Sequence, residues 1–433
     1  MTGSRKWPRG IGITLGVLAL LAVTFVSLIP SDEELARRAA AELEAVLGVP
    51  VNIGGLQWHL LPSPLVEIED AATGQPQPLK VKKLVAYLDT AALWRRRVKV
   101  DRAVLRGAVV PQLSLRALGR EDRAAGTGKP GGFSIDEIPL AHFEFRDVTW
   151  ISRRGNHIVY DGEVDFDARW RPRTAQLRRP EVIPATDLTL TRQGQDDRWD
   201  LRANAGGGTA NGQVELKSGA AGAMRLTGKL QPRGIEVYTA LHAFNRRSIV
   251  AGKASGETTL SAGGATAGEL AQSLHTTTSF TMGRSTLLRF DLAKAIRTVG
   301  KDHAGETPLD SINGQLDTQN TPEGMVVDYS KIKATSGALS ASGKARVANR
   351  QIDAEFAVDL VKGLVGVPLK ISGPLDQVKV SVPASAVAGA VVGTTVLPGI
   401  GTAIGARIGA AIGQIFGSKP AGKTSATPAG KRP

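Results

Sequence analysis

The stretch that decides the fold class is Glu163-Val-Asp-Phe-Asp-Ala-Arg-Trp170. Apolar and charged residues alternate along it without a break, so every second side chain falls on the same face of an extended strand. A helix would mix both kinds of residue around its circumference. The stretch therefore predicts a β-strand with one apolar face and one face in contact with water.

The same alternation recurs on both sides of this stretch. Gly-containing breaks separate the predicted strands by roughly 8–15 residues, the spacing of an antiparallel meander. We predict a mainly β chain built on antiparallel strands. If these strands form one long, curled sheet, their apolar faces line a groove. The residues predicted to line that groove are Val164, Phe166, Ala168, Trp170, Leu188, Leu190, Leu201, Leu226, Ile352, Ala354, Phe356, Val358 and Leu360.

Helical patterns are few and short. The longest begins with a capping box, Ser31-x-x-Glu34, and ends at Leu47, before Gly48. The other four patterns are 90–94, 234–245, 267–274 and 292–299. So few helices argue against a parallel α/β fold, and they are too few to cover a large sheet. Either two sheets face each other as a sandwich, or one sheet curls and something else covers its apolar face.

An uncharged, largely apolar run extends from Gly10 to Ile29. A helix of this length spans about 30 Å, the thickness of the hydrocarbon core of a bilayer. Basic residues precede the run and acidic residues follow it, so the N-terminus is expected in the cytoplasm and the remainder outside. We favour an uncleaved membrane anchor over a signal peptide, because the apolar region is long and Ser27-Leu28-Ile29 is a poor cleavage site.

Composition narrows the class of protein further. The chain has 433 residues, of which 50 are Gly, and only 5% are aromatic, so a thick globular core is not expected. The formal net charge is +14, without a dense basic patch on the body of the chain. This charge suits anionic lipid head groups or polyanions outside the cell equally well, and nucleic acid is a poor partner beyond a membrane. There is no Cys, which excludes disulfides, thiolate metal sites and a thiol nucleophile.

Three segments carry a resemblance to a known family: residues 46–64, with Trp58 and Leu61-Pro62; residues 251–274, with a Gly-marked strand before a short helix; and Val367-Pro-Leu-Lys-Ile-Ser-Gly-Pro-Leu375. In this order along the chain they resemble the AsmA family. The resemblance covers most of residues 1–382, although Leu288-Arg-Phe-Asp-Leu292 replaces the usual Gly-x-Asp-Leu turn. It implies an inner-membrane-anchored periplasmic protein. Larger relatives are curled sheets with an apolar groove, implicated in moving phospholipid and maintaining the outer membrane.

We find no catalytic motif. The six His residues share no metal-ligand spacing, and neither Gly206–Gly212 nor Gly399–Gly405 has the Lys-Ser/Thr pair of a phosphate-binding loop. Two carboxylate pairs, Asp165/Asp167 and Asp353/Glu355, fit an acid–base site in principle and a solvated strand face better. We therefore expect no enzyme, no metal and no cofactor.

The C-terminal part changes composition. Residues 384–417 are rich in Ala, Gly, Val and Ile, and five glycines recur at every fourth position: Gly401, Gly405, Gly409, Gly413 and Gly417. Such a stripe lets membrane helices approach closely. We favour a helical hairpin in or on a membrane; the alternatives are a helix that covers the open end of the sheet, and disorder. Residues 418–433 are predicted to be a disordered basic tail.

These observations give the following predicted organisation: anchor 1–30, AsmA-like module 31–118, flexible loop 119–132, elongated sheet region 133–383, glycine-zipper segment 384–417 and tail 418–433. The predicted function is binding or transfer of phospholipid in the groove, in support of outer-membrane assembly, with envelope proteins as further candidate partners. The alternative is a closed β-sandwich that acts as a scaffold or assists outer-membrane protein assembly. An enzyme acting on envelope glycan is a distant third.

Overall fold

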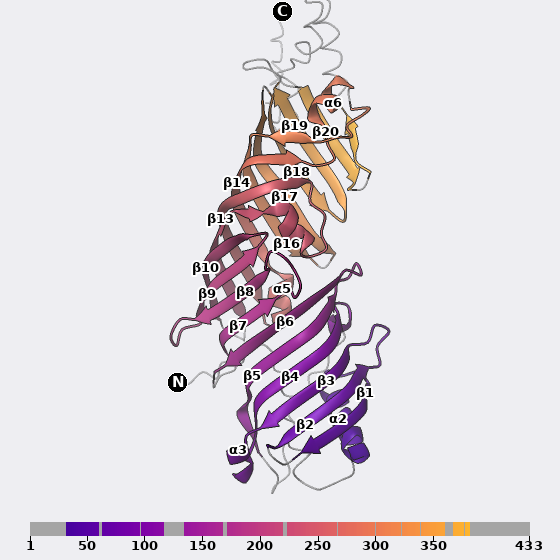
Figure 1. The fold of residues 1–433 in the computed structure, drawn as a ribbon, viewed down its shortest axis with the longest axis vertical. Helices are drawn as coiled ribbons and strands as arrows, with labels where there is room; N and C mark the ends of the chain where they lie inside the picture. Colours follow the sequence, from indigo (N-terminus) through magenta and orange to yellow (C-terminus); the bar gives the residue numbers. More distant parts are fainter. Residues whose placement is uncertain are drawn as a thin grey trace, which may run out of the picture. The chain divides into compact units, whose positions relative to one another are not determined.

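The chain is mainly β, with a few short helices (Figure 1). The computed structural model describes residues 32–59, 63–95, 97–116, 134–167, 171–219, 223–265, 267–298, 300–321, 323–337, 339–359, 367–375 and 377–381. Its strands belong to one sheet that contains both antiparallel and parallel pairs. The chain divides into two compact units, unit 1 (1–283 and 316–325) and unit 2 (284–315 and 326–433). Strands β14, β16 and β17 contribute residues to both units.

Unit 1 contains the N-terminal helix and most of the strands. Its elements are α2 (Asp32–Leu47), β1 (Val51–His59), β2 (Leu65–Thr73), β3 (Lys80–Leu88), α3 (Thr90–Trp94), β4 (Arg97–Pro111), η1 (Ser114–Arg116), β5 (Ser134–Ile151), β6 (His157–Phe166), β7 (Pro172–Arg178), β8 (Asp187–Arg192), β9 (Arg198–Ala205), β10 (Gly208–Ser218), β11 (Met224–Arg233), β12 (Ile235–Glu236), α4 (Val237–His242), β13 (Val250–Gly264), α5 (Ala267–Gln272) and parts of β14 (His275–Leu287), β16 (Ser311–Thr321) and β17 (Gly324–Ser336).

Helix α2 covers the first strands of unit 1 (Figure 1). It ends at Leu47 as predicted, and Gly48 follows with a φ of +72°, a left-handed conformation that suits glycine. Ala39 and Leu43 on α2 pack with strand residues such as Val100 and Leu140, both 0% exposed. This part of unit 1 therefore has an ordinary closed core.

Among the strand pairs whose register is described, the predicted antiparallel order fails at one pair. The meander β1–β2–β3–β4 is antiparallel, but β4 and β5 run parallel, with Ala103 opposite Phe143 and Val109 opposite Thr149. A parallel pair needs a crossover connection, which a hairpin turn cannot provide. The prediction of a purely antiparallel sheet was wrong here, because alternation along a strand carries no information on the direction of its neighbour.

Unit 2 is smaller and has its own core. Its elements are α6 (Leu292–Arg297), β15 (Thr307–Leu309), β18 (Leu339–Ala348), β19 (Gln351–Asp359), β20 (Val367–Pro374), β21 (Lys379–Ser381) and the remaining parts of β14, β16 and β17. Leu292 of α6 packs against Val358 and Leu369, and Asp291 caps the helix by accepting from the backbone N–H of Lys294 at 2.8 Å. Helix α6 therefore covers the apolar face of β19 and β20 (Figure 1).

Glycines provide hollows that neighbouring aromatic rings fill. A Cβ on Gly162 in β6 would lie 2.4 Å from Cζ of Phe145, which is opposite it in β5. In unit 2, a Cβ on Gly343 would lie 2.4 Å from Cδ1 of Phe356, its partner in β19. Because no real contact is so short, the ring occupies space that any other residue would need. Part of the high glycine content thus serves side-chain packing on the sheet.

This packing gives a test of stability. We expect Gly162→Ala to destabilise the protein by about 1–3 kcal/mol, the usual cost of overpacking, because both Phe145 and the carbonyl of Gln176 would have to move. Gly55→Ala in β1 is the matched control, since its Cβ would meet only Glu69 Cβ at 3.9 Å. The measurement is the thermal unfolding midpoint of the two variants, and equal midpoints would contradict the packing argument.

Candidate functional site

Apolar residues of unit 1 stand in register across strands β5 to β11. Phe143 pairs with Val164, and the same row continues along the sheet through Ala175, Leu190, Leu201, Gly212 and Leu230. Because the side-chain period of a strand is two, residues two positions away along each strand form the neighbouring rows on the same side. Most of these residues are apolar as well. We call this surface the apolar face; its large residues are Phe143, Phe145, Val164, Phe166, Leu177, Leu188, Leu190, Trp199, Leu201, Val214, Leu216, Leu226, Leu230 and Leu260.

Most of the apolar face is only partly buried. Leu188, Leu190, Leu201 and Leu226 are all intermediate in exposure, in contrast to the fully buried strand residues beneath α2. Among the described helices of this region, α4 and α5 pack chiefly against β11 to β13. The protein therefore removes these leucines from solvent only in part, which leaves some of their apolar surface available to a ligand.

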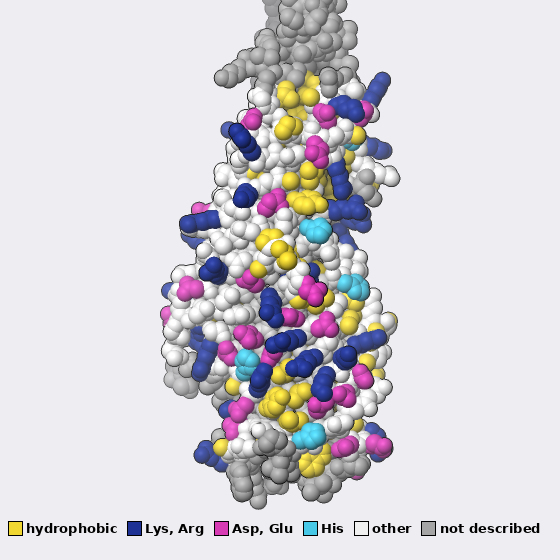
Figure 2. Space-filling view, viewed as in Figure 1, with side chains coloured by type: hydrophobic (Ala, Val, Ile, Leu, Met, Phe, Trp, Pro, Cys, Tyr) yellow, Lys and Arg dark blue, Asp and Glu magenta, His cyan; other side chains and the backbone are white. Residues whose placement is uncertain are grey.

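The opposite face of the same strands is polar. The row next to the leucines consists of Glu144, Glu163, Gln176, Thr189, Arg202, Asn211 and Gln231. Figure 2 shows basic and acidic side chains interleaved over the N-terminal strands. Glu144 is 8% exposed and is paired with Arg102 and with Arg146, 2.6 Å away. The hydrogen bond from Arg102, followed by that from Arg146, holds the pKa of Glu144 below its usual value.

The predicted lining residues of unit 2 have a different environment. Val358 is 0% exposed and belongs to the core beneath α6, and Ala354 is 1% exposed. Phe356 packs against the same core, and Ile352 is partly exposed. Ala354 and Val358 are therefore buried residues, and Val358 packs with Leu292 of α6, so the prediction that they line an open groove was wrong.

At one rim of the apolar face, four charged residues form a buried group that we call the charged rim cluster: Asp167, Arg171, Arg192 and Asp197. The side chains of Arg171 and Arg192 are 2% and 5% exposed. Arg171 Nη1 lies 2.6 Å from Asp197 Oδ1, and Arg192 pairs with Asp167. Two positive and two negative charges balance here, which is the condition for burying them.

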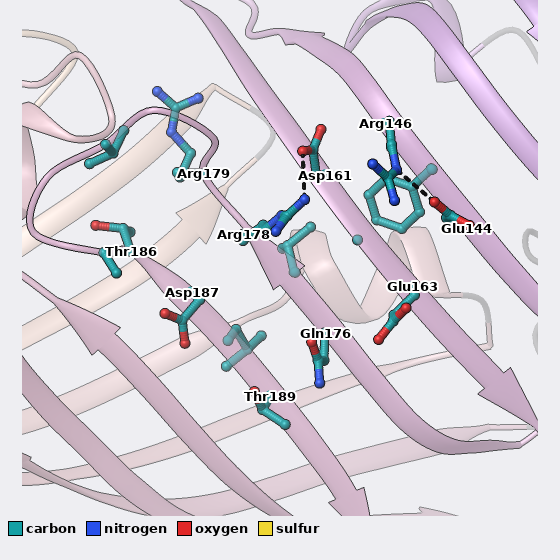
Figure 3. A pocket seen from close by; sticks show the side chains of 16 residues that line it. Glu144, Arg146, Asp161, Glu163, Gln176, Arg178, Arg179, Thr186, Asp187 and Thr189 are labelled. Carbon is teal, nitrogen blue, oxygen red and sulfur yellow. Dashed lines mark hydrogen bonds and ion pairs between the residues drawn. The ribbon is translucent and has the colours of Figure 1, made fainter.

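A pocket of about 390 Å³ lies toward the opposite rim, under the loop 179–186 (Figure 3). Its lining includes four apolar-face positions, Phe145, Gly162, Leu177 and Leu188, with Val182 and Ala185 of the loop. Charged residues of the same strands also border it, and most of them are paired: Arg178 with Asp161 at 3.2 Å and Arg146 with Glu144. Ten of the sixteen lining residues are polar or charged, so the pocket lacks the predominantly apolar lining that is typical of small-molecule sites.

Asp165 and Asp167, the first carboxylate pair considered from the sequence, have different partners. Asp165 accepts a hydrogen bond from Thr174 (2.5 Å) and contacts His142 (2.6 Å), whereas Asp167 belongs to the charged rim cluster. Burial acts to raise the pKa of Asp165, but these two hydrogen bonds lower it below its usual value. In unit 2, Glu355 pairs with Lys344 at 3.4 Å. Asp165, Asp167 and Glu355 thus each take part in their own ion pair or hydrogen bond.

Several predicted features lie outside the described residues: the anchor 10–29, the loop residues 119–132, the lining residues Ala168, Trp170 and Leu360, and the glycine-zipper segment 384–417. Within the described ranges, no helix is both long and apolar enough to cross a bilayer. Sequence reasoning missed the charged rim cluster and the His275–Asp317 pair (2.9 Å). Turns separate the members of the charged rim cluster, and 42 residues separate His275 from Asp317. No local sequence pattern therefore predicts either group.

Comparison of the chain with protein-family models, with curated proteins and with solved structures gave no match.

Proposed function

We propose that this chain is an AsmA-like, non-catalytic envelope protein that holds phospholipid acyl chains on the apolar face of unit 1 and so supports outer-membrane assembly. In this proposal residues 10–29 anchor it in the inner membrane, the bulk of the chain is periplasmic, and residues 384–417 make a second membrane contact. The observation that carries the proposal is the row of register-matched, partly exposed leucines between β8 and β11.

Acyl chains fit this surface for energetic reasons. Each methylene removed from water contributes about 0.8 kcal/mol, so a single acyl chain laid along the leucine rows gains enough to stay bound. Charged side chains on the opposite face form ion pairs, so that face favours contact with solvent over contact with lipid. The head group would remain near a rim, where arginines are available.

A scaffold without ligand is the second candidate. The closed cores beneath α2 and α6 favour it, because there the apolar strand residues are covered by protein. The two functions differ in what contacts Leu190: a lipid in the first case, and protein in the second.

Neighbouring residues of β8 permit a direct test. A photo-crosslinking amino acid would replace either Leu190, on the apolar face, or Thr189, on the polar face, in the full-length chain expressed in a double-membrane bacterium labelled with radioactive phosphate. We expect a phospholipid adduct from position 190 and none from position 189. Adducts to protein alone at position 190, or equal lipid labelling at both positions, would contradict lipid binding on this face.

A further inference from the structure

Four large apolar side chains of unit 1 are exposed at the rim opposite the charged rim cluster. The exposed fractions are 92% for Ile183, 55% for Ile249, 47% for Tyr238 and 37% for Leu241. Single exposed apolar residues are normal on a protein surface, whereas several gathered at one place mark an interaction site. The question is therefore whether the segments that carry them lie together.

Hydrogen bonds and packing join these segments. Arg179 Nε, at the start of the loop 179–186, donates to the carbonyl of Ala243 behind α4 at 2.9 Å. Pro184 of the same loop lies 3.7 Å from where a Cβ on Gly207 would stand, in the β9–β10 turn. Glu236, which precedes α4, donates its backbone N–H to the first residue of that turn at 3.1 Å. We call the combined surface the loop rim: residues 179–186, 206–207, α4 and 243–250.

The loop rim also carries free positive charge. Arg246 and Arg247 are exposed, and neither forms an ion pair with a residue that the structure describes. The backbone N–H of Arg246 donates to the carbonyl of Leu241 at 2.9 Å, so the arginines follow directly on the apolar side chains of α4. The carboxylate of Glu236 caps α4, accepting from Thr239 N at 2.6 Å, and Glu181 is the acidic residue of the loop.

We propose that the loop rim docks on the surface of an anionic phospholipid bilayer. The aliphatic ends of Ile183 and Ile249 enter the boundary between head groups and acyl chains, Tyr238 lies at the depth where amphipathic rings are favoured, and Arg246 and Arg247 bind lipid phosphates. A soluble anion would satisfy the arginines and leave the apolar side chains in water. This inference goes beyond the proposed function, because it needs only the rim and no lipid on the apolar face.

The loop rim borders the apolar face of unit 1. Leu177 and Leu188, the rim-side residues of the apolar face, lie two positions before Arg179 and two after Thr186, at the two ends of the loop. The pocket beneath the loop contains both leucines. A bilayer at the loop rim would therefore meet the edge of the apolar face.

The absence of Cys from the sequence makes a single-site probe possible. The full-length Ile249→Cys variant would be labelled with a polarity-sensitive fluorophore and reconstituted into vesicles. One set of vesicles contains phosphatidylcholine alone, and the other contains phosphatidylcholine mixed with phosphatidylglycerol. We expect a blue-shifted, brighter emission on the anionic vesicles only. Salt at about 1 M, where charges are screened beyond about 3 Å, should reverse the shift. The control is the same label at Met325→Cys, an apolar residue of unit 1 that is 48% exposed and not part of the loop rim.

The double variant Arg246→Ala/Arg247→Ala should weaken binding to anionic lipid. The concentration of anionic lipid that produces the emission shift of the Ile249 probe should rise by roughly 30-fold. No shift at position 249, an equal shift on neutral vesicles, an equal shift at position 325, or a shift that depends on protein concentration without vesicles would each overturn the proposal. Photo-crosslinking from Leu190 is read separately, so a silent rim with a lipid adduct at Leu190 would reject the docking surface alone.

Discussion

Leu201→Asp should reduce phospholipid crosslinking from position 190 by about tenfold or more, while the protein stays folded. Leu190 and Leu201 are opposite each other in β8 and β9, and both are partly exposed on the apolar face. A leucine that an acyl chain covers contributes about 1.5–3 kcal/mol, and each 1.4 kcal/mol is a factor of ten in affinity. A carboxylate at this position would also have to be desolvated by the lipid.

The control for this variant is Arg202→Asp, one residue further along β9 on the polar face. It alters charge on the same strand without touching the apolar face, so crosslinking from position 190 should be unchanged. Thermal unfolding decides between the two candidate functions. If Leu201→Asp unfolds unit 1, protein covers the leucine and the scaffold is favoured; if it folds and crosslinks lipid like the parent chain, the apolar face is not the lipid site.

Arg171→Met should destabilise unit 1 by about 3–5 kcal/mol, the largest loss of stability that we expect from one substitution. The Arg171 side chain is 2% exposed, and its guanidinium lies 2.6 Å from the carboxylate of Asp197, which is 12% exposed. Removal of the arginine leaves Asp197 buried with Arg192 3.8 Å away as its nearest ion-pair partner in the cluster. The measurement is the urea midpoint of the purified full-length protein.

The double variant Arg171→Met/Asp197→Leu should recover most of that loss. Both members of one ion pair are then replaced by apolar groups of similar volume, a change that is often neutral or stabilising, and Arg192 keeps its pair with Asp167. The interaction energy from this double-mutant cycle measures the coupling of the pair. A small effect of Arg171→Met alone would mean that the cluster is hydrated and does not stabilise the rim.

Much of the local structure was predictable because it depends on neighbours in the sequence. The prediction of a helix ending at Leu47 before Gly48 was confirmed, and the pattern at 90–94 coincides with α3. The alternation from Glu163 to Phe166 and from Ile352 to Val358 was confirmed as strands β6 and β19. In each case one side-chain period or one capping signal is sufficient.

The sequence by itself thus determined that this protein is mainly β, where its short helices lie, and which residues of a strand share a face, because these properties repeat every two or every 3.6 residues. The tertiary structure alone decided the parallel pairing of β4 with β5, the burial of Val358 beneath α6 while Leu190 stays partly exposed, and the meeting of Arg171 with Asp197. These depend on contacts between segments far apart in the chain, and local periodicity does not record them.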